Sequence, residues 1–232
     1  YLGDILVCGL NSDADVAKAK GKTLMDIKER SSLAGASKWI GELALDTPYA
    51  PPIDTLDTYK CDYLAHGDDI PTNEHGNTIY DDIIAKKRLR VFRRTEGIST
   101  TVIIGRLLLG MKDKFDSLDE KDEKSLAIKK SYEDLEKASN LQYGTMTTLL
   151  TTSYRIADFS NKKMPEPGQK VVYICGEFDV LHMIHIEALK KAKESGDFVF
   201  VGVYDDITVN KRKGKYNPVL NINERCLNLL AL

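Results

Sequence analysis

An arginine, a glycine and several hydroxyl side chains stand together in residues 94–101, which read Arg-Thr-Glu-Gly-Ile-Ser-Thr-Thr. An apolar helical pattern begins directly afterwards, at residue 102. A helix that starts near Ser99 points unpaired N–H groups and the positive end of its dipole at whatever precedes it. Gly97 lets a ligand approach the backbone closely, and the planar Arg94 guanidinium suits phosphate oxygens. The run therefore predicts a polyphosphate site, with an ordinary helix start capped by Ser99 as the alternative.

A second feature is an internal repeat. Residues 3–9, Gly-Asp-Ile-Leu-Val-Cys-Gly, recur as Gly-Asp-Phe-Val-Phe-Val-Gly at residues 196–202. The same offset pairs Asp13 with Asp206, and Lys20-Gly21-Lys22 with Lys213-Gly214-Lys215. After two extra residues in the second copy, residues 26–30 match 221–225, which pairs Arg30 with Arg225. The period is far longer than a solenoid unit, so the repeat indicates a duplicated domain.

The repeat also predicts which part of each copy is present. The second copy has a strand and a helix before its Gly-Asp, whereas the first copy starts at Tyr1. We therefore expect a first domain over residues 1–111 that lacks its N-terminal strand and first signature. A charged linker and interdomain segment over residues 112–169 should follow, and then the N-terminal part of a second domain over residues 170–232. We expect neither partial domain to form a stable core alone.

Composition indicates a globular chain. Hydrophobic residues make up 42%, charged residues 29%, and the formal net charge is −2. That balance provides no net positive electrostatic field to attract nucleic acid or an anionic membrane surface. No apolar run reaches membrane-span length. The four cysteines, at positions 8, 61, 175 and 226, lie far apart and have no zinc spacing. We therefore expect reduced, buried thiols, a cytoplasmic location and no protein-held metal.

Short apolar runs alternate with helical patterns along the chain. The expected strands are residues 5–10, 63–65, 171–175 and 199–203, and the expected helices are residues 29–43, 79–87, 100–112 and 185–194. This alternation predicts an α/β doubly wound fold with parallel sheets, in which ligands bind beyond the carboxyl ends of the strands. Two polar motifs follow expected strands there: His66-Gly67-Asp68-Asp69 and Gly176-Glu177-Phe178-Asp179.

These motifs resemble those of a known family. Residues 94–101 resemble the second signature of the cytidylyltransferases that activate choline, ethanolamine and glycerol phosphates. His182-Met183-Ile184-His185 resembles their first signature, His-x-Gly-His, with isoleucine in place of glycine. Residues 56–70 are similar to the stretch before the substrate loop of the ethanolamine-phosphate branch, which carries two such domains in tandem. The likeness covers nearly the whole chain except residues near 113–140.

The resemblance implies two tandem Rossmann-like domains and a reaction. CMP would pass from CTP, with Mg²⁺, to phosphoethanolamine, giving CDP-ethanolamine and pyrophosphate for phosphatidylethanolamine synthesis. It implies Lys20 and Arg94 as catalytic residues of the first domain. The residues implied to bind CTP or the acceptor in that domain are Arg30, His66, Gly67, Asp68, Asp69, Thr95, Gly97, Ile98, Ser99, Thr100 and Thr101. The second domain would carry a nucleotide-binding-like site at Glu177, Phe178, Asp179, His182, His185, Lys213 and Arg225.

Two further expectations concern single side chains. Asp68 or Asp69 is expected to face the ammonium group of ethanolamine. The branched Ile184 side chain, at a crowded helix start, should block close approach of a triphosphate, so the second domain is expected to be catalytically degenerate.

Alternatives stay open at this point. Lys20 and Lys213 fit exposed turn lysines, Arg30 and Arg225 fit helix-surface residues, Asp68-Asp69 fits a turn cap, and His182 and His185 fit helix-start histidines. For the whole chain, the alternatives are a non-catalytic nucleotide-binding scaffold or sensor, and a relative that uses phosphocholine or glycerol phosphate. The expected partners are CTP and phosphoethanolamine, with packing between the two domains, no nucleic acid and no integral membrane contact. A homodimer and peripheral contact with the endoplasmic reticulum are left open.

Overall fold

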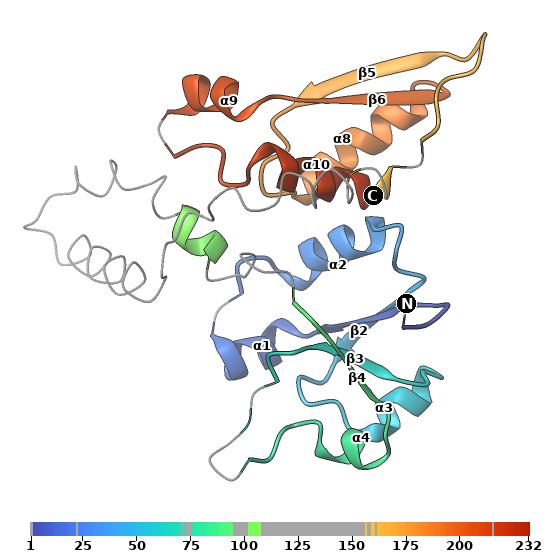
Figure 1. The fold of residues 1–232 in the computed structure, drawn as a ribbon, viewed down its shortest axis with the longest axis vertical. Coiled ribbons are helices and arrows are strands. Elements are labelled where there is room, and N and C mark those ends of the chain that lie inside the picture. The colour runs from blue at the N-terminus through green and yellow to red at the C-terminus, as the bar shows by residue number, and fades with distance from the viewer. Residues whose placement is uncertain are drawn as a thin grey trace, which may run out of the picture. The chain divides into compact units, whose positions relative to one another are not determined.

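The computed structural model describes residues 2–21, 23–70, 72, 76–94, 102–107, 156, 159–160, 162–214 and 216–232. Within these residues the strands pair in three two-stranded parallel sheets (Figure 1). The pairs are β1 (Val7–Asn11) with β2 (Glu42–Thr47), β3 (Leu64–Gly67) with β4 (Leu89–Phe92), and β5 (Val171–Gly176) with β6 (Phe198–Val203). The predicted α/β class with parallel pairing is confirmed, and the strands alternate with helices along the chain.

The chain divides into two units. The first comprises residues 1–95, 182–186 and 232, and the second comprises residues 96–181 and 187–231. In each unit, polar segments follow the carboxyl ends of strands and lead into short helices.

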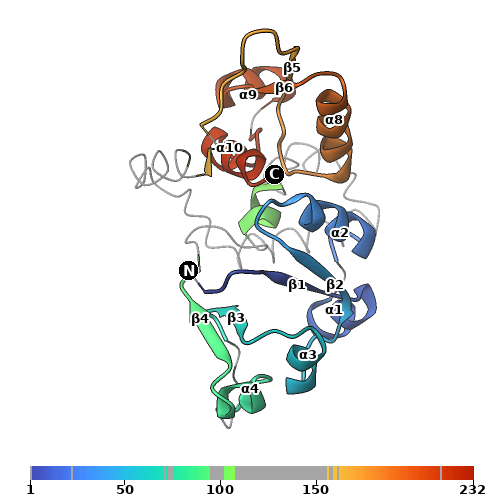
Figure 2. The same cartoon turned by 90° about the vertical axis from the view of Figure 1, so that its right-hand side faces the viewer.

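In the first unit, β1 leads into α1 (Asp13–Lys20) and α2 (Ile27–Ala36), and the chain returns in β2. Asp26 and Glu29 start α2 with a reciprocal capping box, which satisfies two N–H groups at the helix start. Helix α2 contacts both β1 and β2, as Figure 2 shows. The elements α3 (Ile53–Thr58), β3, α4 (Asp81–Ala85) and β4 follow.

A small apolar core fixes the β3–β4 pair. Leu56 of α3, Ile83 of α4 and Tyr80 beside it are buried. The partly buried residues that pack against them include Leu64 of β3 and Leu89 of β4. Because both strands are anchored here, the segments that leave their carboxyl ends have defined starting points.

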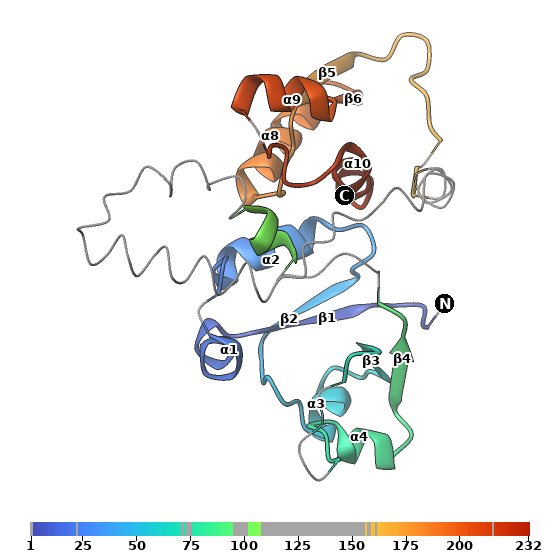
Figure 3. The ribbon, with the colours of Figure 1, turned by 60° about the vertical axis from the view of Figure 1, so that its left-hand side comes forward.

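In the second unit, β5 pairs with β6, and α9 (Asp206–Lys213) and α10 (Ile222–Leu230) follow β6 (Figure 3). Helix α8 (Met183–Glu194) links the two strands in sequence. Phe178, Val209, Val219 and Leu220 are buried around the loop and helices that follow the strands. A turn before β5 includes Gly168, which has a φ of 90°.

The repeated sequences fold into equivalent elements. Helices α1 and α9 end at glycines with φ of 92° and 95°, Gly21 and Gly214, a conformation that glycine adopts without steric cost. Helices α2 and α10 both begin with a capping box, Asp26 with Glu29 and Asn221 with Glu224. The repeat read from the sequence therefore marks a structural duplication.

Some expected boundaries are wrong. The helix expected over residues 29–43 ends at Ala36, and Glu42–Thr47 forms strand β2 instead. The reason is tertiary: the Gly41 and Glu42 amides donate to the Leu6 carbonyl at 3.0 and 3.3 Å, which draws the chain alongside β1. The helix expected over residues 79–87 is shorter, Asp81–Ala85. Of the helix expected at 100–112, residues 102–107 are described and helical.

The expected burial of the thiols is wrong: Cys175 is exposed because alternate residues of β5 face solvent, and the other three cysteines are only partly buried. All four cysteines are free thiols, as expected. The charged stretch 112–140 and the segment 141–155 lie outside the described residues.

Candidate functional site

Arg94 and the motif His66-Gly67-Asp68-Asp69 come together at one edge of the β3–β4 sheet. Gly67 and Phe92 are register partners at the ends of the two parallel strands, so the residues that follow them leave at the same edge. The Asp69 carboxylate forms an ion pair with Nη1 of Arg94. The Arg94 amide donates to Oδ1 of Asp68 at 3.1 Å. The sequence placed these residues in one site, and the structure brings them into contact.

Gly67 and His66 line the same edge. A Cβ atom on Gly67 would lie 2.8 Å from both Cγ of Arg94 and Oδ1 of Asp69, so a side chain there would force Arg94 and Asp69 to shift. Nδ1 of His66 lies 2.9 Å from the Gly67 carbonyl oxygen, and its ring stacks at a tilt on Tyr80, with the centroids 5.0 Å apart. Burial raises the pKa of Tyr80, which keeps this phenol neutral beside the motif.

Lys20 and Arg30 lie near the carboxyl end of β1. Lys20 ends α1, and its Nζ is 5.7 Å from the centroid of the Tyr49 ring. Nη2 of Arg30 donates to the Asn11 carbonyl at 2.9 Å and to the Asp13 carboxylate at 2.5 Å. The hydrogen bond from Arg30 is the main reason that the pKa of Asp13 is lowered. Arg30 therefore has protein partners that join β1 to α1.

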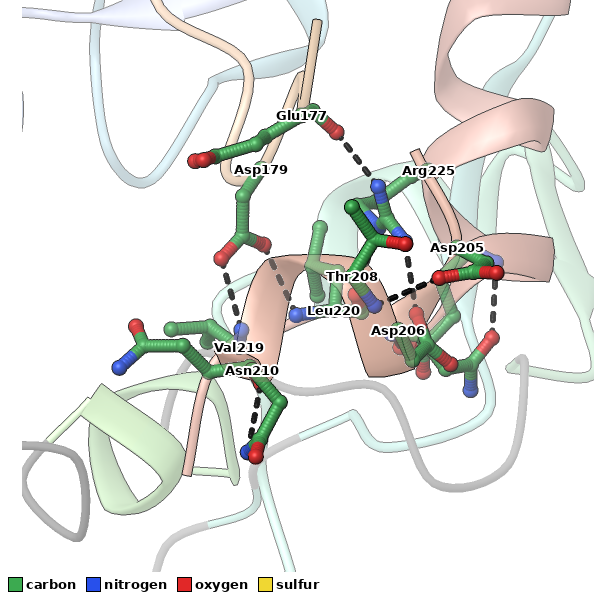
Figure 4. A network of polar contacts seen from close by, with 12 residues as sticks. Glu177, Asp179, Asp205, Asp206, Thr208, Asn210, Val219, Leu220 and Arg225 are labelled. Atoms are coloured by element: carbon green, nitrogen blue, oxygen red, sulfur yellow. Dashed lines mark hydrogen bonds and ion pairs between the residues drawn. The ribbon is translucent and has the colours of Figure 1, made fainter. Parts of the chain in front are cut away.

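The second copy has the same arginine arrangement, fully buried (Figure 4). The Arg225 guanidinium donates from Nε to the Leu220 carbonyl at 3.0 Å, from Nη1 to the Glu177 carbonyl at 2.7 Å and from Nη2 to Asp206 at 2.6 Å. The helix-surface alternative is therefore wrong for Arg225. The repeat itself held the signal, because it pairs Asp13 with Asp206 and Arg30 with Arg225.

Acidic residues of the β5 loop bind α9 and the start of α10. Glu177 forms an ion pair with Nζ of Lys213, which ends α9. The Asp179 carboxylate accepts hydrogen bonds from the Val219 and Leu220 amides at 2.7 and 2.9 Å (Figure 4). Phe178, between them, is buried with a φ of 50°. The Lys213 ammonium thus already has a counter-ion within the protein, which reasoning from sequence missed.

The two histidines lie at the start of α8. His182 directly precedes the helix, and its amide donates to Nδ1 of His185 at 3.0 Å. This contact is a local cap, as the helix-start alternative predicted. Ile184 between them is 66% exposed, so its side chain stands in solvent at the helix start. The other members of the 94–101 run, Thr95, Gly97, Ile98, Ser99, Thr100 and Thr101, lie outside the described residues.

The described residues contain no group of three or more His, Cys, Asp or Glu side chains placed to hold a metal ion. None of the helices in those ranges combines the length and apolarity that crossing a bilayer requires.

The structure is that of an α/β protein with parallel strand pairs, in which the second copy repeats elements of the first. The chain belongs to the cytidylyltransferase-like family, whose family model matches residues 1–106 and 173–232. These two matched stretches contain both copies of the repeat, with the segment between them outside the match.

Individual relatives show how far along this chain the similarity extends. The chain is 38% identical over 231 residues to an ethanolamine-phosphate cytidylyltransferase of Dictyostelium discoideum, covering 99% of this chain and 63% of the relative. It is 36% identical to the Arabidopsis thaliana protein of that name, covering 99% of this chain and 56% of the relative. A choline-phosphate cytidylyltransferase of A. thaliana is 37% identical over 106 residues, covering 44% of this chain and 34% of the relative. The chain thus spans about 60% of the length of the ethanolamine-phosphate relatives.

The expectation that Ile184 blocks a triphosphate at the second copy predicts a gain of binding when this side chain is removed. In the full-length protein with Lys20 and Arg94 both changed to alanine, Ile184→Gly should raise CTP affinity, measured by titration calorimetry. Glycine near a helix start costs about 1 kcal/mol or less, so the fold should survive. We expect a partial gain without turnover, because the Glu177–Lys213 ion pair persists. An unchanged affinity in a protein that still melts cooperatively would show that Ile184 does not limit CTP binding at the second copy.

Proposed function

We propose that the full-length protein transfers CMP from CTP to phosphoethanolamine, releasing pyrophosphate and CDP-ethanolamine. The choice of phosphoethanolamine as the acceptor rests on how much of this chain each kind of relative matches. The ethanolamine-phosphate relatives match 99% of this chain, through both copies, whereas the choline-phosphate relative matches only 44%. The match to the choline-phosphate relative extends over only 106 residues, fewer than half of this chain.

The reaction joins two polyanions, so positioning and positive charge are the main contributions that protein groups can make. An oxygen of phosphoethanolamine forms a bond to the α-phosphorus of CTP, and the bond from that phosphorus to the bridging oxygen breaks. The electron pair leaves with pyrophosphate. Arg94, at the carboxyl edge of β3–β4, would contact phosphate oxygens through its planar fork. Lys20 would add a second positive charge.

Magnesium enters this proposal as the counter-ion of CTP. A protein-held site does not fit the described residues, because they contain no suitable group of ligands and Asp68 and Asp69 are both bonded to Arg94. The triphosphate itself supplies the oxygen ligands that Mg²⁺ prefers. No step is assigned to a metal bound by this chain.

The acceptor preference is the direct test. With CTP and Mg²⁺, the full-length protein should release pyrophosphate at least about tenfold faster with phosphoethanolamine than with phosphocholine, a discrimination of about 1.4 kcal/mol. Glycerol phosphate serves as the second comparison. Equal rates, or a preference for phosphocholine, would remove the ethanolamine assignment and leave only the family. No pyrophosphate with any acceptor would favour the non-catalytic nucleotide-binding alternative.

The second copy has a different proposed role. Its lysine is paired with Glu177, its arginine is buried in a structural network and its His-x-Gly-His equivalent carries Ile184. We propose that it braces the protein and does not turn over substrate. A cytoplasmic location, peripheral contact with the endoplasmic reticulum and a homodimer remain predictions.

A further inference from the structure

The ion pair between Arg94 and Asp69 has little value for stability where it stands. The Arg94 side chain is 46% exposed and the Asp69 side chain is 51% exposed. Pairs this open to water are screened by solvent and by salt, and many contribute nothing measurable to folding. Its location, at the sheet edge where the phosphate site is proposed, is better explained by a role in positioning the arginine.

Two further contacts hold the same arginine. Its amide donates to Oδ1 of Asp68 at 3.1 Å, so the backbone at position 94 is fixed as well as the guanidinium. At Gly67 a Cβ atom would sit 2.8 Å from Cγ of Arg94 and 2.8 Å from Oδ1 of Asp69. The arginine stem and the aspartate therefore pack directly over the glycine. Three consecutive residues thus act on the backbone, the stem and the charged end of Arg94.

We propose that Gly67-Asp68-Asp69 forms a seat that orients Arg94 towards the CTP phosphates, with Asp69 as a positioning residue. The identity of the anion rests on the proposed function. A guanidinium has five N–H donors, and the ion pair with Asp69 is made through Nη1, so the fork retains donors for phosphate oxygens. An arginine held in this way loses less conformational freedom when phosphate binds, because its side chain is already ordered. This assignment replaces the expectation that Asp69 faces the ammonium group of ethanolamine.

The test removes the charge of Asp69 and keeps its shape. In the full-length protein, Asp69→Asn should lower kcat/KM for CTP about tenfold, within the roughly 10²-fold loss that a misplaced contact group can cause. The KM for phosphoethanolamine and the melting temperature should stay unchanged. Asp69→Glu should restore part of the loss. In an Arg94→Lys background, Asp69→Asn should add little, because the positioned group is gone.

A matched control comes from the same unit. Asp57 pairs with Arg88 at 2.6 Å, with side-chain exposures of 61% and 25%, and neither residue belongs to the proposed site. Asp57→Asn should therefore leave the CTP parameters unchanged. A rise in the KM for phosphoethanolamine alone would overturn the positioning role and support an ammonium contact. A similar loss in both the Asp57 and Asp69 variants, with lower melting temperatures, would overturn it in favour of a purely structural role.

A second measurement separates this proposal from the proposed function. In ¹⁵N-arginine-labelled protein without ligand, the Arg94 side chain should give an ordered NεH signal that loses its order in Asp69→Asn. If the wild-type protein has no cytidylyltransferase activity but this signal behaves as stated, the proposed reaction is wrong. The result would still support the positioning of Arg94 by Gly67-Asp68-Asp69. If Arg94 is equally mobile in both proteins, the seat is wrong, whatever the activity.

Discussion

Changing Lys20 to alanine in the full-length protein is expected to lower kcat/KM by about 10²-fold or more, equivalent to about 2.7 kcal/mol of transition-state stabilisation. Lys213→Ala, at the same position of the repeat, is expected to change kcat/KM little. The two lysines therefore form a matched pair within one chain. The comparison identifies which copy carries the reaction.

The structure supplies a physical reason for the difference. The Lys213 ammonium is paired with Glu177, whose side chain is only 15% exposed, so a phosphate would have to displace a neighbouring carboxylate. Lys20 lies over the ring of Tyr49, a neutral partner that does not cancel its charge. Lys20 therefore keeps its full charge towards a polyanion, whereas part of the Lys213 charge is offset by Glu177.

Melting temperatures control for loss of folding, since Lys213→Ala leaves Glu177 without its partner. Initial rates of pyrophosphate release at varied CTP give kcat and KM separately. Greater damage from Lys213→Ala, in a protein that melts normally, would mean that the second copy is the active one. Equal, small effects of the two substitutions would show that Lys20 does not stabilise the transition state.

The sequence predicted the parts of the fold that local pattern and duplication determine. Strands β1, β3, β5 and β6 were predicted because apolar runs bounded by polar residues are strong signals, whereas β4 was missed. Strand β2 was missed because the local pattern around Leu43 also suits a helix, and only pairing with β1 selects the strand. Helices α1 and α9 were not predicted because their apolar residues form no clear stripe along one face. The repeat nevertheless indicated that the two segments are equivalent.

For the site, neighbours in sequence were easier to predict than partners across the fold. The motif from His66 to Asp69 and the run at Arg94 were both singled out, but not the ion pair that joins them. Charge pairs such as Glu177–Lys213 depend on how a loop and a helix end meet, and residue spacing does not record that. Arg225 was read as a phosphate ligand or a surface residue, whereas its partners are main-chain carbonyls and a carboxylate.

That network gives the largest expected effect on stability. Arg225→Met should lower the free energy of unfolding of the second unit by about 3 kcal/mol, the low end for breaking a buried charge pair. The cost comes from the carbonyls of Leu220 and Glu177, which lose their donor inside the protein. Asp206 contributes less, because it is 42% exposed and regains water. Met fills most of the volume of the arginine stem, so little of the effect would be a cavity.

Arg30→Met is the matched control, at the equivalent position of the first copy. The Arg30 side chain is 22% exposed and Asp13 is 38% exposed, so we expect a smaller loss, about 1 kcal/mol, for a solvent-accessible pair. Because the chain has two units, hydrogen exchange in α9–α10 and in α1–α2 measures each loss locally. The lowered pKa of Asp13 stabilises the fold above its ordinary value of 3.8, and this contribution is lost as the pH falls through the folded-state pKa. The Arg30→Met difference should therefore shrink in acid. A loss at Arg30 as large as that at Arg225 would show that burial does not set the strength of these networks.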